Sequence, residues 1–196
     1  MASASHVATF VAIARFVGIV FPALYCGVTC DYSFTFVQPI VDHAPNQKVM
    51  AKQWYYGYRT GPLWVPPLVA PGTFSNLFLA YIAKDPFQQN FYLAAAMGIF
   101  SILPITFLYM EPGINGAAKW KTQTLLKDEG FSLPETTIFM PSARKHGGTQ
   151  ASRRWAEKTD MKELILHWRF INNFRWVIGG IAAVLSGYAT LSQLAV

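Results

Sequence analysis

The sequence predicts an all-α membrane protein, a bundle of four transmembrane helices with a long cytosolic connection between the third and fourth helices. Of its 196 residues, 53% are hydrophobic and only 13% are charged, whereas about a quarter of an ordinary soluble domain is charged. Four tracts contain no charged residue, and each approaches the roughly 20 residues that cross a bilayer; they are 16–30, 60–83, 86–110 and 176–196. A soluble helical domain would show a polar stripe along such helices, which these tracts largely lack.

The four helices are expected at about 7–30, 62–83, 88–110 and 165–194, within a single domain of residues 1–196. The first helix carries Arg15, and a charged side chain inside the membrane is unfavourable in free energy. We expect this helix to be retained after synthesis, because residues 1–6 lack the basic segment of a signal peptide. The second contains Pro66, Pro67 and Pro71. These prolines leave two interpretations open, a kinked helix or a broken helix that lines a cavity.

The basic residues predict the orientation of the chain in the membrane. Three Lys and Arg residues lie in 31–59 and ten in 111–173, whereas the connection on the opposite side has only Lys84. This bias predicts cytosolic loops at 31–61 and 111–164 and lumenal termini. The net charge of +6 then faces anionic lipid of the bilayer, not nucleic acid. We expect a multi-pass protein of the endoplasmic reticulum or another endomembrane, and assembly into a homo-oligomer is left open.

The start of the fourth helix is the most informative stretch. At 3.6 residues per turn, Trp168, Asn172, Arg175 and Gly179 share one face. An amide and a guanidinium facing lipid would be costly, so this face is expected to look inward. The alternative is an Arg that snorkels to the headgroups beside an interfacial Trp. Small residues at spacing four, namely Gly179, Ala183 and Gly187, are expected to pack this helix against its neighbours.

A second cluster precedes the second helix, where Trp54 and Tyr58 lie one turn apart. Aromatic residues at a bilayer edge are commonly an anchoring belt. The predicted topology also places this cluster on the same side as the 167–175 stretch, so that the two segments can meet. Aromatic walls, hydroxyls, an amide and a cation would suit a flat, phenolic, partly anionic ligand.

Histidines are the remaining titratable candidates. Glu163 precedes His167 by one helical turn, and His43 follows Asp42. No histidine pair has the helical spacing of metal ligands. A metal site made of His43, His167 and a carboxylate stays an open alternative.

The order of these motifs resembles the fungal anthrone oxygenases, a family of small four-helix membrane proteins. The family has a Pro after its first helix and a Trp-x-x-x-Tyr-x-x-Gly stretch before its second. It also has a Met-x-Pro-x-Asn-like exit from its third helix and Trp-x-x-x-Asn/His-x-x-Arg at the start of its fourth. The matching residues are Pro39; Trp54, Tyr58, Gly61 and then Pro66 or Pro67; Met110, Pro112 and Asn115; Trp168, Asn172 and Arg175. The exit departs from the pattern by one residue, and the connection from Trp120 to Asp160 is longer than in the family.

The resemblance implies an oxidoreductase of secondary-metabolite biosynthesis, a monooxygenase that converts an anthrone-type polyketide phenol to an anthraquinone. The co-substrate would be O2, with no recognised flavin or haem cofactor, and the histidine metal site stays the open alternative. It implies that His167 or His43 is the base and that Arg175 and Asn172 hold the oxyanion. Trp54, Tyr58 and Trp168 would form the substrate walls, with Asn115 beside them. The competing interpretation is a non-catalytic membrane subunit or scaffold that docks a partner through its long basic loop.

Overall fold

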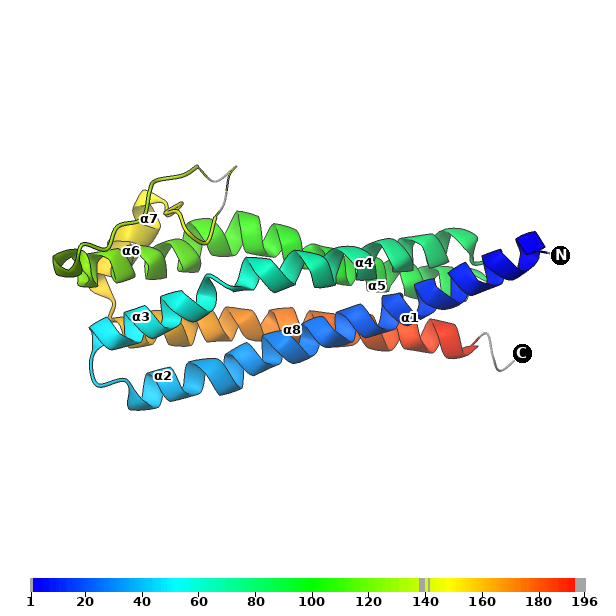
Figure 1. Cartoon of the computed structure of the whole chain (residues 1–196), viewed down its shortest axis with the longest axis horizontal. Helices are drawn as coiled ribbons and strands as arrows, with labels where there is room; N and C mark the ends of the chain where they lie inside the picture. Colours follow the sequence, from blue (N-terminus) through cyan, green and yellow to red (C-terminus); the bar gives the residue numbers. More distant parts are fainter. Residues whose placement is uncertain (1, 138–139, 141, 193–196) are drawn as a thin grey trace. The chain divides into compact units, whose positions relative to one another are not determined.

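The computed structural model describes residues 2–137, 140 and 142–192, with the backbone alone for residues 2–4. This part of the chain contains helices and no β-strand (Figure 1). The elements in order are α1 Ala2–Asp31, η1 Tyr32–Phe36, α2 Val37–His43, α3 Gln47–Tyr58, α4 Gly61–Ile82, α5 Pro86–Pro104, η2 Ile105–Asn115, α6 Gly116–Leu125, η3 Lys127–Glu129, α7 Gln150–Lys158 and α8 Met161–Ser192.

Four helical segments are long and apolar enough to cross a membrane: Ser5–His43, Gln47–Ile82, Pro86–Leu125 and Met161–Ser192. Large apolar side chains on them point outward, with Phe74 69% and Val184 70% exposed. Such a surface is unfavourable in water and suits the hydrocarbon core of a bilayer. The predicted all-α membrane fold is therefore confirmed, and the protein is a multi-pass membrane protein.

The expected helix ends at 30 and 110 are wrong, and the expected loops 31–61 and 111–164 are largely helical. The first helix continues through η1 and α2 to His43, and the third continues through η2 and α6 to Leu125. The predicted ends coincide with the first charged residues, Asp31 and Glu111, which the structure keeps inside helical segments. A charged side chain ends an apolar tract without ending the backbone hydrogen bonding of a helix.

Two compact units are distinguished within the chain. Unit 1 comprises residues 1–29, 65–102 and 175–196, and unit 2 comprises residues 30–64 and 103–174. The longest helices, α1, α4 and α8, contribute to both units. The expectation of a single domain stays a prediction.

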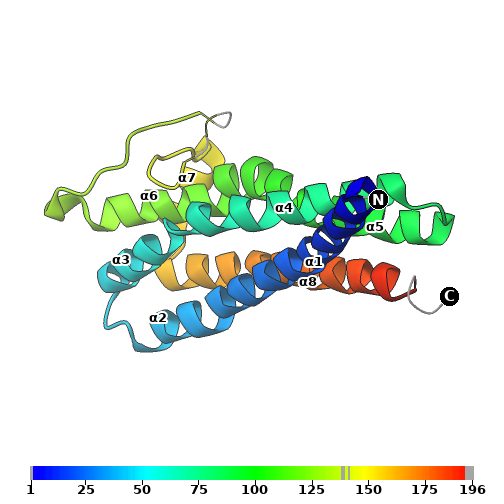
Figure 2. The ribbon, with the colours of Figure 1, turned by 45° about the vertical axis from the view of Figure 1, so that its right-hand side comes forward.

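The core of unit 1 packs residues of α1, α4, α5 and α8, namely Ala14, Leu79, Ala80, Tyr92 and Ala189. The helices α4 and α5 form a hairpin joined by residues 83–85 (Figure 2). Polar side chains within this unit are satisfied locally: the Asn76 amide donates to the carbonyl of Gly18 at 2.9 Å. The hydroxyls of Tyr92 and Thr190 are 3.0 Å apart.

The small-residue face of α8 differs from the expected one. A Cβ on Gly179 would lie 2.9 Å from Tyr25 Cδ1, whereas a Cβ on Gly187 would meet nothing within 4 Å. The buried small residues that follow Gly179 are Ala182, Ser186 and Ala189. Their spacing alternates between three and four, which follows the 3.6-residue helical repeat more closely than a strict spacing of four.

The proline-rich second span is a continuous α-helix over Gly61–Ile82, so the broken-helix interpretation is wrong. Side chains supply hydrogen bonds in the region of the prolines. The Thr73 hydroxyl donates to the Val69 carbonyl at 2.9 Å, and the Asn76 amide donates to the Gly72 carbonyl at 2.9 Å. Neighbouring polar side chains of this kind make proline tolerable in a membrane helix.

Unit 2 is built from short helices around α6. The helices α3 and α7 pack against α6, and α2 packs against α3 (Figures 1 and 2). Side chains cap two of them: Asn46 accepts a hydrogen bond from Val49 N at 3.0 Å, and Thr149 accepts one from Ser152 N at 3.2 Å. The first part of α8 completes this unit and contributes Leu164, Ile165 and Trp168 to its core.

Candidate functional site

The buried centre of unit 2 contains a carboxylate. Glu111 is only 6% exposed and lies on the π-helical segment η2. Gly113, directly after Pro112, departs from helical geometry with φ −92° and ψ −107°. Departures of this kind from regular α-helix are frequent at functional sites.

Three side chains donate hydrogen bonds to the Glu111 carboxylate. The Tyr58 hydroxyl and Asn115 Nδ2 donate to Oε1, the amide at 2.7 Å. Lys119 Nζ donates to Oε2 at 2.7 Å. Glu111, Asn115 and Lys119 are spaced by four residues along η2 and α6, so their side chains lie on one face.

Lys119 is fully buried and makes a second hydrogen bond, from Nζ to the Ser142 carbonyl at 3.0 Å. Its ammonium also lies 5.7 Å from the centre of the Tyr58 ring. A buried charge is costly unless it is paired and hydrogen-bonded. Glu111 and Lys119 meet that condition together, and each depends on the other.

Aromatic rings adjoin this ion pair. Trp54 stacks on Tyr58 with ring centres 4.8 Å apart and planes 9° apart, and Trp168 meets Trp54 edge-on at 6.3 Å. Within the described residues, Nε1 of Trp54, Nε1 of Trp168 and Oδ1 of Asn115 are buried without a hydrogen-bond partner. Buried polar atoms seldom lack partners, so these three are available to a ligand.

The loop that carries His146 lies against α6. A Cβ on Gly116 would come within 2.6 Å of Gly148 Cα, so a side chain there would push the loop away. His146 N donates to the Pro134 carbonyl at 2.7 Å, and Thr136 N donates to the His146 carbonyl at 3.0 Å. The imidazole meets the Trp120 ring edge-on at 5.1 Å. Backbone pairing and ring packing therefore hold His146 in place.

The His146 imidazole is neutral at pH 7. Burial lowers its pKa below the ordinary value of 6.5, and the positive charges of Arg153 and Lys119 lower it further. Nδ1 accepts a hydrogen bond from Gly148 N at 3.3 Å, which places the proton of the neutral ring on Nε2. That N–H is buried and has no acceptor among the residues described.

A protein-family model described as anthrone oxygenase matches residues 54–185. The chain belongs to the anthrone oxygenase family. It is also 24% identical over 138 residues to the anthrone oxygenase encC of Aspergillus fumigatus, which covers 70% of this chain and 68% of that protein. No solved structure matches the chain.

The anthrone oxygenase match includes Trp54, Tyr58, Trp168 and Asn115, the residues expected to bind substrate. The structure brings these four into one cluster: Tyr58 and Asn115 donate hydrogen bonds to Glu111. Trp54 stacks on Tyr58, and Trp168 meets Trp54 edge-on. Their role in substrate binding stays a prediction.

Asn172 and Arg175 are both buried, in agreement with the inward-facing interpretation. Within unit 2, Asn172 Nδ2 donates to Ser33 Oγ at 3.0 Å. Within unit 1, the Arg175 guanidinium lies 5.9 Å from the centre of the Tyr25 ring. Ser33 and Tyr25 lie before residue 54, outside the range that the anthrone oxygenase model matches.

The two histidines expected to act as the base are exposed. The His167 ring packs edge-on against Trp155 at 5.1 Å, and His43 ends α2. The structure brings neither of them to the Glu111 cluster. Within the described residues, no three His, Cys, Asp or Glu side chains gather as a metal site would require.

Sequence reasoning missed Glu111 and Lys119 as members of this candidate site. A signal was present, because Glu111 directly follows an uncharged tract and Asn115 and Lys119 continue from it at spacing four. The assumption that a loop begins at 111 hid this spacing. His146 was recognised only as a titratable residue, since nothing near it in sequence indicates burial.

Proposed function

We propose that this protein is a membrane oxygenase that converts an anthrone-type polyketide phenol to an anthraquinone with O2. Membership of the anthrone oxygenase family supports the reaction class. The observation that carries the proposal is the buried carboxylate of Glu111, held by Tyr58, Asn115 and Lys119 beside the stacked ring of Trp54.

The overall reaction is balanced by O2 alone. The methylene carbon of the anthrone loses two hydrogens and gains one oxygen atom as a carbonyl. The second oxygen atom leaves with those two hydrogens as water. The methylene is acidic because its carbanion is an aromatic anthranolate, and that electron-rich anion passes an electron to O2. Recombination of the two radicals gives a peroxide, and loss of water from the peroxide gives the quinone.

The protein must supply a proton acceptor in a water-poor site. We assign this role to the Glu111 carboxylate acting with Tyr58. The Tyr58 oxygen takes the methylene proton as its own proton moves along the existing hydrogen bond to Oε1 of Glu111. Lys119 and Asn115 keep the carboxylate oriented. The exposed positions of His43 and His167 favour Glu111 over either histidine.

The aromatic side chains supply the surface for a flat substrate. Trp54, Tyr58 and Trp168 are in mutual contact, so a tricyclic ring binds against them only when at least one ring moves aside. Among the described residues, the indole N–H groups of Trp54 and Trp168 have no hydrogen-bond acceptor. They are suitable donors to phenolic or carbonyl oxygens. Donors placed at developing negative charge are a principal source of catalysis.

Product analysis in a host that makes the anthrone tests the function. We expect quinone formation above the slow spontaneous air oxidation seen with an empty vector. Glu111→Gln keeps the shape of the side chain and is expected to reduce turnover about 10²-fold or more. The matched control Glu129→Gln, at an exposed position paired with Lys52, is expected to retain turnover. Quinone levels equal to those of the empty vector would favour the scaffold interpretation.

The orientation in the membrane belongs to the same proposal. The excess of basic residues in 31–59 and 111–173 supports cytosolic connections and lumenal termini in the endoplasmic reticulum. A glycosylation acceptor site appended to either terminus is expected to be modified, whereas one inserted after Gly130 is expected to stay unmodified. The reverse pattern would contradict this orientation.

A further inference from the structure

Asn115 carries a hydrogen-bond acceptor that the described part of the chain does not satisfy. The side chain is 2% exposed, and its Oδ1 is buried without a hydrogen-bond partner among the described residues. Its other polar atom, Nδ2, donates to Oε1 of Glu111 at 2.7 Å. An ionised carboxylate only accepts hydrogen bonds, so the amide cannot turn over and present Oδ1 to Glu111. The orientation of this acceptor is therefore fixed by its neighbour.

The acceptor lies beside the proposed base. The Tyr58 hydroxyl and Asn115 Nδ2 donate to the same oxygen, Oε1 of Glu111, so the two side chains meet at one atom. The Trp54 ring stacks on Tyr58 with ring centres 4.8 Å apart. A flat ligand whose reacting carbon reaches the Tyr58 oxygen therefore brings its ring edge to the amide of Asn115.

The unpartnered atoms of this cluster select ligands in different ways. Nε1 of Trp54 and Nε1 of Trp168 are donors, and any hydroxyl, ether or carbonyl oxygen satisfies a donor. Oδ1 of Asn115 is an acceptor, which is satisfied only by a group that carries a polar hydrogen. A buried polar atom that stays unpaired is unfavourable. Asn115 can therefore distinguish a hydroxyl from other substituents, whereas the two indoles cannot.

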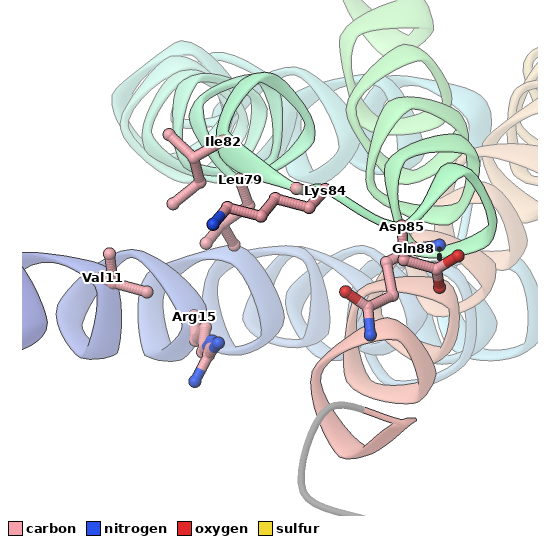
Figure 3. Close-up of a pocket in the computed structure, with 8 residues that line it drawn as sticks. Val11, Arg15, Leu79, Ile82, Lys84, Asp85 and Gln88 are labelled. Carbon is pink, nitrogen blue, oxygen red and sulfur yellow. Dashed lines mark hydrogen bonds between the residues drawn. The ribbon is translucent and has the colours of Figure 1, made fainter. Parts of the chain in front are cut away.

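Asp85 shows the contrast, in a pocket of about 310 Å³ at the hairpin between α4 and α5 (Figure 3). Its carboxylate accepts hydrogen bonds from Phe87 N at 3.3 Å and Gln88 N at 3.4 Å. The start of α5 therefore provides donors to this carboxylate without a ligand. Asn115 Oδ1 has no such donor in the part of the chain that the structure describes, and a ligand can provide one.

We infer that Asn115 Oδ1 accepts a hydrogen bond from the substrate and selects anthrones that have a free phenolic hydroxyl on the methylene side of an outer ring. This inference rests on the proposed function. Hydroxyls next to the ring carbonyl of an anthrone are already hydrogen-bonded to that carbonyl within the molecule. The methylene lies on the opposite side of the central ring, where a hydroxyl has no internal acceptor. Such a hydroxyl is a free donor close to the carbon that Tyr58 deprotonates.

Two substrates that differ only by this hydroxyl test the inference. The compound 1,3,8-trihydroxyanthrone carries it, and 1,8-dihydroxyanthrone lacks it. Quinone formation from each is measured in membranes that contain the full chain, above the air oxidation in empty-vector membranes. The hydroxyl preference is the ratio of the two kcat/KM values. We expect Asn115→Ala to lower this ratio about tenfold or more, because only the wild type has a buried acceptor that the second substrate leaves unpaired.

The ratio separates this role from a structural one. Asn115→Ala also removes the hydrogen bond to Glu111, but that loss slows both substrates alike and cancels in the ratio. Asn76→Ala is the matched control, since Asn76 of unit 1 is a buried amide whose Oδ1 likewise has no partner among the described residues. Its Nδ2 donates to the Gly18 carbonyl at 2.9 Å. We expect Asn76→Ala to keep the hydroxyl preference of the wild type.

A binding measurement serves if Asn115→Ala turns over too slowly. Quenching of tryptophan fluorescence gives the Kd of the two corresponding anthraquinones, and the same fall in preference is expected. A preference that is unchanged in Asn115→Ala, or that falls equally in Asn76→Ala, would overturn the role of Asn115 and leave the proposed function in place. If the wild type forms no quinone above background from either substrate, the proposed function is wrong and this inference falls with it.

Discussion

Lys119 Nζ donates to Oε2 of Glu111 at 2.7 Å, and both side chains are buried in the centre of unit 2. The pair joins the π-helical exit of the third span to α6. Through Ser142 it also contacts the loop that carries His146. One ion pair thus connects the proposed proton acceptor to the segments around it.

Removing one partner of this pair is expected to be more harmful than removing both. Lys119→Met leaves Glu111 buried without its counter-charge, and we expect a loss of about 3–5 kcal/mol in the free energy of unfolding. In Glu111→Gln/Lys119→Met both charges are absent, and stability is expected to return close to that of the wild type. Circular dichroism during denaturation in micelles measures both changes.

The exposed pair Lys52–Glu129, at 2.5 Å, is the matched control. Because solvent screens this pair, Lys52→Met is expected to cost at most about 1 kcal/mol. Equal losses for Lys52→Met and Lys119→Met would mean that burial does not strengthen the Glu111 interaction.

Tyr58→Phe isolates the hydroxyl from the ring. The variant keeps the stack on Trp54 but loses the donor to Glu111, so we expect turnover to fall about 10²-fold while the fold is retained. Tyr55→Phe, on the same helix and packed on Phe131, is expected to leave turnover unchanged. Quinone production measured in matched membrane preparations compares the two, and undiminished production by Tyr58→Phe would exclude the proposed relay.

Substitution of the exposed histidines is expected to leave turnover nearly unchanged. His167→Ala and His43→Ala are each expected to keep turnover within about twofold of the wild type, because neither side chain reaches the buried cluster and general-base groups must lie within hydrogen-bond reach of the proton they take. A loss of 10²-fold or more in either variant would return the base to that histidine and remove it from Glu111.

His146 predicts a pH dependence of stability. Burial lowers its pKa, so the unfolded chain binds a proton more readily than the folded protein. Its contribution is complete above the unfolded value of 6.5 and is lost as the pH falls from there through the folded pKa, by at most about 1.4 kcal/mol per pH unit. Relative to His146→Gln, the wild type should lose melting temperature between pH 7.5 and 5.5. Parallel pH profiles for the two proteins would refute this.

Gly179 and Gly187 on α8 give a matched pair for packing. An added methyl at Gly179 would lie 2.9 Å from Tyr25 Cδ1 and 3.3 Å from the Pro22 carbonyl, whereas Gly187 has open space. Gly179→Ala is expected to cost about 1–3 kcal/mol through overpacking. Gly187→Ala is expected to be neutral or slightly stabilising, since alanine favours the helix. Thermal denaturation of both variants tests whether α8 closely approaches Tyr25 and Pro22 at Gly179. Equal melting temperatures for the two variants would contradict this close approach.

The sequence alone was sufficient for the four spans and for the aromatic part of the site. Uncharged tracts of bilayer length leave few alternatives to a transmembrane helix, because backbone polar groups in lipid must be hydrogen-bonded within the helix. Helical spacing likewise places Trp54 and Tyr58 one turn apart on one helix. It also places Trp168 and Asn172 on one face of another helix, and both relations depend only on the 3.6-residue repeat.

The tertiary structure decided the charged part of the site and the role of the histidines. Charged residues in a sequence ordinarily indicate a solvated loop, and by that rule the stretch after Met110 is predicted to be one. Only the fold shows that Glu111 is buried, because Lys119 and Tyr58 approach it and offset its desolvation. Burial of a titratable group depends on partners distant in sequence, and so His167 is exposed and His146 is enclosed although both lie in polar stretches of the chain.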